Sequence, residues 1–161
     1  DYVLQKPILQ SQIYQLLSDV CQIPEAEDAA CADLDFGGKP VLVVEDNAVN
    51  AEVLIAYLAR VHLRAEWKRN GAEAVAAFLR KPEGYYSAVF MDLNMPVLDG
   101  IEAAKQIRGS GRADAGRIPV IAVTANAGSG SIVRIHEAGM NTSVLKPIES
   151  TVLYETLRNY I

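Results

Sequence analysis

Short β-branched runs alternate with amphipathic, helix-like stretches from Pro40 to the end of the chain. Strands that helices cover on both faces are apolar throughout, so this alternation predicts a parallel sheet between two layers of helices. The five segments that we expect to form strands are 41–44, 64–68, 88–91, 120–123 and 143–145. The predicted fold class is therefore α/β, with a βα unit repeated five times.

Apolar residues at helical spacing follow each predicted strand. The stripes that we expect on one face of the five helices are, in chain order, Val49, Val53, Leu54 and Leu58; Ala72, Val75, Ala76 and Leu79; Ile101, Ala104 and Ile107; Ile132 to Ala138; and Val152, Leu153 and Leu157. Gly139 is expected to end the fourth helix, since glycine is favoured just after a helix. Each helix therefore has an apolar side that can pack.

Residues 19–38 break this regularity. Acidic residues, Pro24 and the pair Gly37-Gly38 leave no sustained period in this stretch. Such a composition is typical of a connection between domains. We interpret residues 19–38 as an acidic linker that precedes the main domain at 39–161.

Residues 1–18 resemble the end of the main domain. They read as a strand-like run followed by an amphipathic helix, and the tripeptide Lys-Pro-Ile at 6–8 recurs at 146–148, an offset of 146 − 6 = 140. We interpret them as the last strand and helix of a preceding copy of the same domain. Chance similarity between two amphipathic helices is the alternative.

The helix predicted in this N-terminal remnant carries Ile13, Leu16, Leu17 and Val20 on one face. A stripe of this kind rarely stays in water. We expect it to pack against the main domain or, by preference, against a second copy of the chain, which would give a homodimer.

Composition excludes several classes of function. The formal net charge is −5 and the isoelectric point is about 5.0, so we expect no binding to nucleic acid, which requires a basic surface. Charges interrupt the apolar stretches before they reach the length of a membrane span, and the first residues form no signal peptide. We expect a soluble, cytoplasmic piece without membrane contact, although its parent protein can be membrane-anchored.

The two cysteines, Cys21 and Cys31, lie outside any C-x-x-C motif or histidine cluster. We interpret them as reduced thiols without a role in metal binding or redox chemistry.

Polar residues follow four of the predicted strands. They are Glu45 and Asp46 after the first strand, Asp92 after the third, Thr124 after the fourth and Lys146 after the fifth. In an open parallel sheet, ligands bind beyond the carboxyl ends of the strands, where the winding reverses. We therefore expect these five side chains to form one site.

The first strand is not followed by a glycine-rich phosphate loop, and the pair Glu45-Asp46 would repel a cofactor phosphate, so nucleotide and flavin binding are disfavoured. Three clustered carboxylates resist ionising together unless a cation lies among them. Mg²⁺ fits better than Ca²⁺, because it accepts one or two carboxylates together with water and phosphate oxygens. An ammonium and a hydroxyl beside the metal, from Lys146 and Thr124, indicate phosphoryl transfer to a carboxylate.

Four stretches together resemble the receiver domain of bacterial response regulators and hybrid sensor kinases. These are VLVVEDN at 41–47, MDLNMPVLDG at 91–100, VTA at 123–125 and LKP at 145–147. The resemblance spans residues 39–161 and implies a flavodoxin-like, doubly wound fold with a five-stranded parallel sheet of strand order 2-1-3-4-5.

The resemblance assigns roles to the residues of the predicted site. Asp92 is expected to be the phosphoacceptor and a ligand of Mg²⁺. Asp46 would bind the metal directly, Glu45 through water, and Asn94 through its backbone carbonyl.

The phosphoryl group would be bound by Thr124, Lys146 and the backbones of Asn94 and Ala125. The peptide bond before Pro147 is expected to be cis, as is usual in the family.

Ser143 departs from the family pattern. It lies three residues before Lys146, where receivers usually carry an aromatic residue that turns inward on phosphorylation. The size of any conformational change is therefore left open, and a neutral substitution is the alternative interpretation.

The resemblance also implies a biological context. The phosphodonor would be a histidine kinase, and the acceptor a histidine phosphotransfer protein unless the phosphoryl group is lost by hydrolysis. We interpret the chain as a fragment from the C-terminal end of a hybrid histidine kinase with tandem receivers.

Two other functions remain open. A degenerate receiver would serve only as an interaction module. An aspartyl-phosphate hydrolase would need a second acid two residues after Asp92, where this chain has Asn94.

Three further features receive simple interpretations. Trp67 on the second strand is expected to pack or to cover the sheet edge, too far from the carboxylates to report on metal binding. The pair Tyr85-Tyr86 is expected to pack likewise, and a surface for a partner protein is the alternative for these aromatic residues. The glycine-rich stretch 109–116 is expected to be a flexible exposed loop.

Overall fold

The computed structural model describes residues 31, 33–126 and 128–161 of the chain. Two predicted segments lie outside the described residues: the receiver remnant at 1–18 and most of the acidic linker. The helix that we expect to form a homodimer belongs to the first of them.

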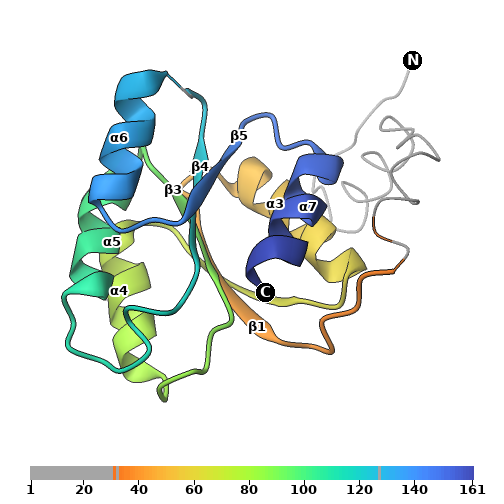
Figure 1. The fold of residues 1–161 in the computed structure, drawn as a ribbon, viewed down its shortest axis with the longest axis horizontal. Helices are drawn as coiled ribbons and strands as arrows, with labels where there is room; N and C mark the ends of the chain where they lie inside the picture. The colour runs from red at the N-terminus through yellow and green to blue at the C-terminus, as the bar shows by residue number, and fades with distance from the viewer. Residues whose placement is uncertain (1–30, 32, 127) are drawn as a thin grey trace, which may run out of the picture.

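A five-stranded parallel sheet lies at the centre of the described domain (Figure 1). Its strands are β1 (Pro40–Val44), β2 (Arg64–Lys68), β3 (Val89–Asp92), β4 (Val120–Thr124) and β5 (Thr142–Leu145). The spatial order is β2-β1-β3-β4-β5, and every neighbouring pair is parallel. The predicted fold class and strand order are confirmed. The winding reverses between β1 and β3, which places the expected ligand site at the carboxyl ends of these two strands.

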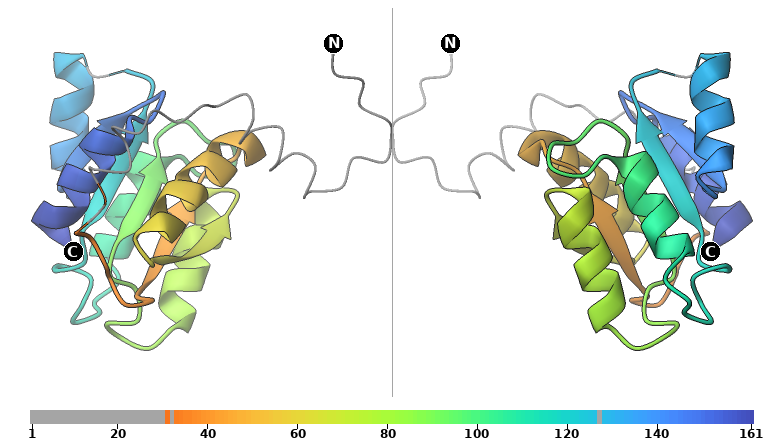
Figure 2. Two further views of the ribbon diagram at one scale, coloured as in Figure 1. Left: turned by 90° about the vertical axis from the view of Figure 1, so that its right-hand side faces the viewer. Right: turned by 90° about the vertical axis from the view of Figure 1, so that its left-hand side faces the viewer.

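Helices cover both faces of the sheet (Figures 1 and 2). They are α3 (Ala48–Arg60), α4 (Gly71–Arg80), α5 (Gly100–Arg108), α6 (Ser129–Glu137) and α7 (Ser150–Tyr160). The helices α3 and α7 pack on one face, and α4, α5 and α6 on the other. Because both faces are covered, β1, β3 and β4 are apolar along nearly their whole length, as a two-layer burial requires.

The buried faces of the first two helices differ from the predicted stripes. In α4 most of the predicted set is wrong, because the structure buries Ala74, Ala77 and Phe78 and leaves Leu79 48% exposed. Of the predicted residues, Val75 alone packs against the core, half-buried. Both sides of α4 carry small apolar residues, and the side with the aromatic ring buries the larger area. In α3, Leu54 and Leu58 are buried as expected, whereas Val49 and Val53 are exposed.

The stripes of the other helices fit better. Ile101, Ala104 and Ile107 are all buried, as are Leu153 and Leu157, while Val152 is exposed. Ile132 and Val133 are exposed, so α6 packs through Ile135 and the following Ala138. Gly139 follows α6 with a φ of 79°, a conformation that glycine adopts without strain.

Side-chain caps fix where three helices begin. Asn47 caps α3 by accepting hydrogen bonds from the backbone N–H groups of Val49 (2.9 Å) and Asn50 (3.2 Å). Asn70 caps α4 and Asp99 caps α5 in the same way. Such caps satisfy N–H groups that have no partner within the helix. They place the three helix N-termini beyond the carboxyl ends of β1, β2 and β3.

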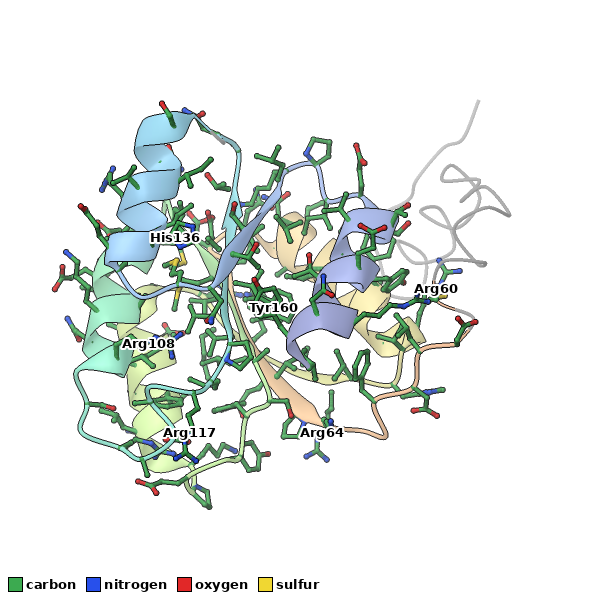
Figure 3. All side chains as sticks on the ribbon, in the orientation of Figure 1. Arg60, Arg64, Arg108, Arg117, His136 and Tyr160 are labelled. Carbon is green, nitrogen blue, oxygen red and sulfur yellow. The ribbon has the colours of Figure 1, made fainter. Side chains whose placement is uncertain are left out.

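The glycine-rich segment 109–116 is held in place, in contrast to the predicted flexible loop. Arg108, at the end of α5 (Figure 3), donates hydrogen bonds to the carbonyl oxygens of Ala115 and Ile118. Arg112 forms an ion pair with Asp114 (2.8 Å), and that carboxylate also accepts the N–H of Gly84 (2.7 Å). Burial lowers the pKa of Arg108, consistent with a guanidinium enclosed by this segment.

The segment just before β1 also lies against the domain. Phe36 and Gly38 donate backbone hydrogen bonds to the carbonyl oxygens of Val61 (3.0 Å) and His62 (2.7 Å). The side chains of Leu34 and Phe36 pack against the core between the sheet and the layer of α3 and α7. The end of the predicted linker is therefore in contact with the domain that follows it.

Phe36→Ala is expected to lower the free energy of unfolding by about 1 to 2 kcal/mol, because part of a buried ring surface is lost. Urea denaturation of the full chain measures this change. Leu79→Ala removes an exposed side chain and should cost less than about 0.5 kcal/mol. Equal losses in the two variants would show that the segment before β1 does not stabilise the domain.

Candidate functional site

The predicted carboxylates meet at the carboxyl ends of β1 and β3. One oxygen each from Glu45, Asp46 and Asp92 lies within 4.8 Å of the others. Glu45 and Asp92 are each 4% exposed, whereas Asp46 faces solvent. Burial raises the pKa of Glu45 in spite of a hydrogen bond from Lys146, and the neighbouring charge of Asp92 acts in the same direction.

Lys146 connects the two buried carboxylates. Its Nζ lies 2.6 Å from Oε2 of Glu45 and 3.0 Å from Oδ2 of Asp92. Burial alone would lower the pKa of Lys146, but the hydrogen bonds to both carboxylates raise it. The ammonium group is therefore held in its charged form between them. The Lys146–Pro147 peptide bond is cis.

Backbone contacts place the remaining predicted residues around Asp92. The backbone N–H of Asn94 donates to Oδ1 of Asp92 (3.2 Å). Thr124, buried at the end of β4, exchanges hydrogen bonds with the backbone N–H and carbonyl of Asn126, both at 3.2 Å. Ala125 follows it and is exposed. All the predicted site residues thus lie at one edge of the sheet.

A cavity of about 550 Å³ opens beside these residues. Asn94, Thr124 and Arg134 of α6 are among the residues that line it. The cavity thus adjoins the ends of β3 and β4, where Asn94 and Thr124 lie.

The loop after β3 folds tightly over the site. Gly100 donates its N–H to the carbonyl of Leu93 (3.2 Å), and a Cβ at Gly100 would collide with the carbonyl oxygen of Asp92. Val97 has a φ of 71° and is 84% exposed, a strained conformation for a β-branched residue. Only glycine at position 100 allows this close return of the chain toward Asp92.

Two residues at the site were missed by the sequence analysis. Asn50, in the first turn of α3, donates its side-chain amide to Oε1 of Glu45 (3.3 Å). Trp67 donates its indole N–H to the backbone carbonyl of Glu45 (2.8 Å), and the guanidinium of Arg69 lies over its ring. The contact of Asn50 with Glu45 could have been suggested by the position of Asn50 in the first turn of the helix that follows Glu45. The contact of Trp67 depends on the pairing of β1 with β2, which no local pattern reveals.

Trp67 lies closer to the carboxylates than we expected from the sequence. The ring packs against the core on the side of α3 and α7, as expected for a tryptophan on an edge strand, yet its indole N–H contacts the backbone of a site residue. Trp67 is therefore close enough to report on changes at Glu45.

Ser143 lies half-buried on β5, paired with Ala122 of β4. No aromatic ring is available at this position to move toward Thr124. The pair Tyr85 and Tyr86 packs edge to face, and Tyr86 donates its hydroxyl to Glu66, which confirms a packing role.

The donor set fits a hard divalent cation. Three carboxylate oxygens converge, two of them on buried residues, and Lys146 can offset only part of their negative charge. Oxygen donors that leave room for water and phosphate are those that Mg²⁺ prefers.

Of the helices in the described part of the chain, none is both long and apolar enough to cross a membrane.

Comparison with known proteins gives the same assignment for the domain. The family described as the response regulator receiver domain matches residues 41–158. Two-component system protein A of Emericella nidulans is 39% identical over 120 residues, which are 74% of this chain and 17% of that protein. This chain thus spans a small part of such relatives.

Two solved structures are similar to this domain. The receiver domain of the sensor histidine kinase PA1611 from Pseudomonas aeruginosa, with a magnesium ion coordinated in its active-site cleft, is 36% identical with a TM-score of 0.69. The alignment covers 77% of this chain and 98% of that one. The receiver domain of Ssk1, crystallised with the phosphotransfer protein Ypd1 from Saccharomyces cerevisiae, is 32% identical with a TM-score of 0.67, covering 76% and 88%.

The relatives include fungal and amoebal proteins as well as bacterial ones, so the match does not assign the chain to bacteria. The motifs at the strand ends, the strand order and the match over nearly the whole described domain agree. The chain belongs to the response regulator receiver domain family of two-component signalling.

Proposed function

We propose that Asp92 accepts a phosphoryl group from a phosphohistidine. The observation that carries this proposal is the convergence on Asp92 of an acidic cluster and the ammonium of Lys146, 3.0 Å from Oδ2. A carboxylate whose neighbours are arranged to offset the charge of a phosphoryl group is a suitable nucleophile for in-line transfer.

The proposed reaction forms one bond and breaks one. A carboxylate oxygen of Asp92 attacks phosphorus, the P–N bond to the donor imidazole breaks, and the ring nitrogen keeps the electron pair. With the other ring nitrogen of the donor protonated, the products are an acyl phosphate and a neutral imidazole. Lys146 offsets negative charge on one phosphoryl oxygen, and the Thr124 hydroxyl and the backbones of Asn94 and Ala125 hydrogen-bond others.

Asp46, Asp92 and the backbone carbonyl of Asn94 are the residues that would hold Mg²⁺, with Glu45 acting through water. The ion would neutralise charge on the phosphoryl oxygens during transfer. The support is the cluster of carboxylate oxygens within 4.8 Å and the magnesium found in the receiver of PA1611.

The partners follow from the same chemistry. The donor would be the phosphohistidine of a histidine kinase, and the phosphoryl group would pass to a histidine phosphotransfer protein or be lost by hydrolysis. The complex of the Ssk1 receiver with Ypd1 supports such a partner. Asn94 stands where a hydrolase would need a second acid, which argues against hydrolysis of external substrates. The remaining alternative is an interaction module that is not phosphorylated, and phosphorylation by acetyl phosphate distinguishes the two.

We place this domain in a longer, cytoplasmically exposed hybrid histidine kinase. The matched region makes up 17% of one curated relative and 8% of another, a peroxide stress-activated histidine kinase. In this proposal residues 1–18 belong to an upstream receiver, 19–38 to a linker and 39–161 to the receiver described above.

Phosphorylation is tested with Mg²⁺ and acetyl phosphate as a small phosphodonor. The full chain should gain the mass of one phosphoryl group, and Asp92→Asn should abolish the gain, because the nucleophilic carboxylate is lost. Intact-mass spectrometry measures both. Asp99→Asn, a nearby carboxylate that can still cap α5 as an amide, is the control and should react like the wild type. Phosphorylation of Asp92→Asn at the wild-type rate would refute the assignment.

Mg²⁺ affinity is expected to depend more on Asp46 than on Glu45, because a direct ligand costs more to lose than one that acts through water. Asp46→Ala should raise the Kd by roughly tenfold or more, and Glu45→Ala by less. Titration followed by Trp67 fluorescence and by calorimetry measures both, since Glu45→Ala keeps the carbonyl that Trp67 contacts. Equal effects would remove this ranking of the two ligands.

A further inference from the structure

The carboxylate of Glu45 is held from two sides. Its Oε2 lies 2.6 Å from the ammonium of Lys146. Its Oε1 accepts two hydrogen bonds from the start of α3, the backbone N–H of Asn47 (3.2 Å) and the side-chain amide of Asn50 (3.3 Å). The two oxygens of one carboxylate therefore have different partners.

The geometry of the helix start leaves the amide of Asn50 free for this contact. Asn50 is the third residue of α3, where a helix-capping side chain often turns back to the backbone N–H of the cap residue. Here Glu45 accepts that N–H of Asn47 instead, and Asn47 itself caps the N–H groups of Val49 and Asn50. The Asn50 side chain is directed at Glu45 rather than at the cap.

A neutral donor on Oε1 has a specific consequence. Lys146 alone would draw the Glu45 carboxylate toward itself through Oε2. The amide opposes this movement without adding positive charge, so the negative charge that attracts a cation is kept. A lysine or arginine at position 50 would orient the carboxylate but would also compete with the metal.

We propose that Asn50 is a positioning residue that fixes the Glu45 carboxylate for the metal while Lys146 serves Asp92 and its phosphoryl group. The inference rests on the proposed Mg²⁺ site. Asn50 acts through Glu45, and Glu45 keeps its place at the cluster when Lys146 turns toward a phosphoryl oxygen. Both contacts of Glu45 with α3 come from a helix N-terminus, where a carboxylate is also favoured by the helix dipole.

Asn50→Ala is expected to raise the Kd for Mg²⁺ by roughly threefold and by no more than Glu45→Ala does, because Asn50 acts only through that carboxylate. Trp67 fluorescence and calorimetry on the full chain measure it. The melting temperature should not fall in parallel, since alanine is the better helix former. Asn159→Ala, at an exposed position on α7, is the matched control and should leave the Kd unchanged.

A double-mutant cycle with Glu45→Ala separates positioning from a general effect on folding. If Asn50 acts through Glu45, Asn50→Ala has no further effect on the Kd once Glu45 is alanine. Additive losses, or an unchanged Kd in Asn50→Ala alone, would overturn the inference. If Asp46→Ala and Glu45→Ala also leave the Kd unchanged, the proposed metal site itself is wrong, so the two failures are distinguishable.

Discussion

The mutual repulsion of three carboxylates is the constraint on which the rest of this site depends. Glu45, Asp46 and Asp92 hold oxygens within 4.8 Å of one another, and two of these residues are almost fully buried. Such a cluster is stable only beside positive charge. Lys146 supplies part of it and is itself fixed, because its backbone N–H donates to the carbonyl of Thr124 (2.8 Å). The remaining negative charge is what a divalent cation would neutralise.

The doubly wound sheet makes this unfavourable cluster possible. The strands β1, β3 and β4 are buried between two layers of helices, and their apolar side chains stabilise the domain without any contribution from the site. Parallel strands end at the same edge, so single polar residues after β1, β3, β4 and β5 meet although they are far apart in sequence. The buried length of each strand thus stabilises the domain, whereas the residues at its carboxyl end form the site.

The fold and the main site residues could be predicted because both depend on local signals. Buried strands are recognisable as apolar runs, and a charged residue directly after such a run must lie at the sheet edge. The errors have a different cause. The packed side of α4, the ordered segment 109–116 and the contact of Trp67 with Glu45 are all decided by partners distant in sequence. Neither glycine content nor helical periodicity contains that information.

Without an aromatic residue at Ser143, a signal from the site must travel through other groups. Thr124 is the residue whose present contacts conflict with its proposed role, because its hydroxyl is hydrogen-bonded to the backbone N–H and carbonyl of Asn126. Turning this hydroxyl to a phosphoryl oxygen gives up its donated bond to the Asn126 carbonyl. The helix that follows, α6, begins at Ser129, and its N-cap residue, Gly128, provides no side-chain cap. The side-chain carbonyl of Asn126 accepts the backbone N–H of Gly128 (2.8 Å), so a shift of Asn126 would be passed to the start of α6 without a ring on β5.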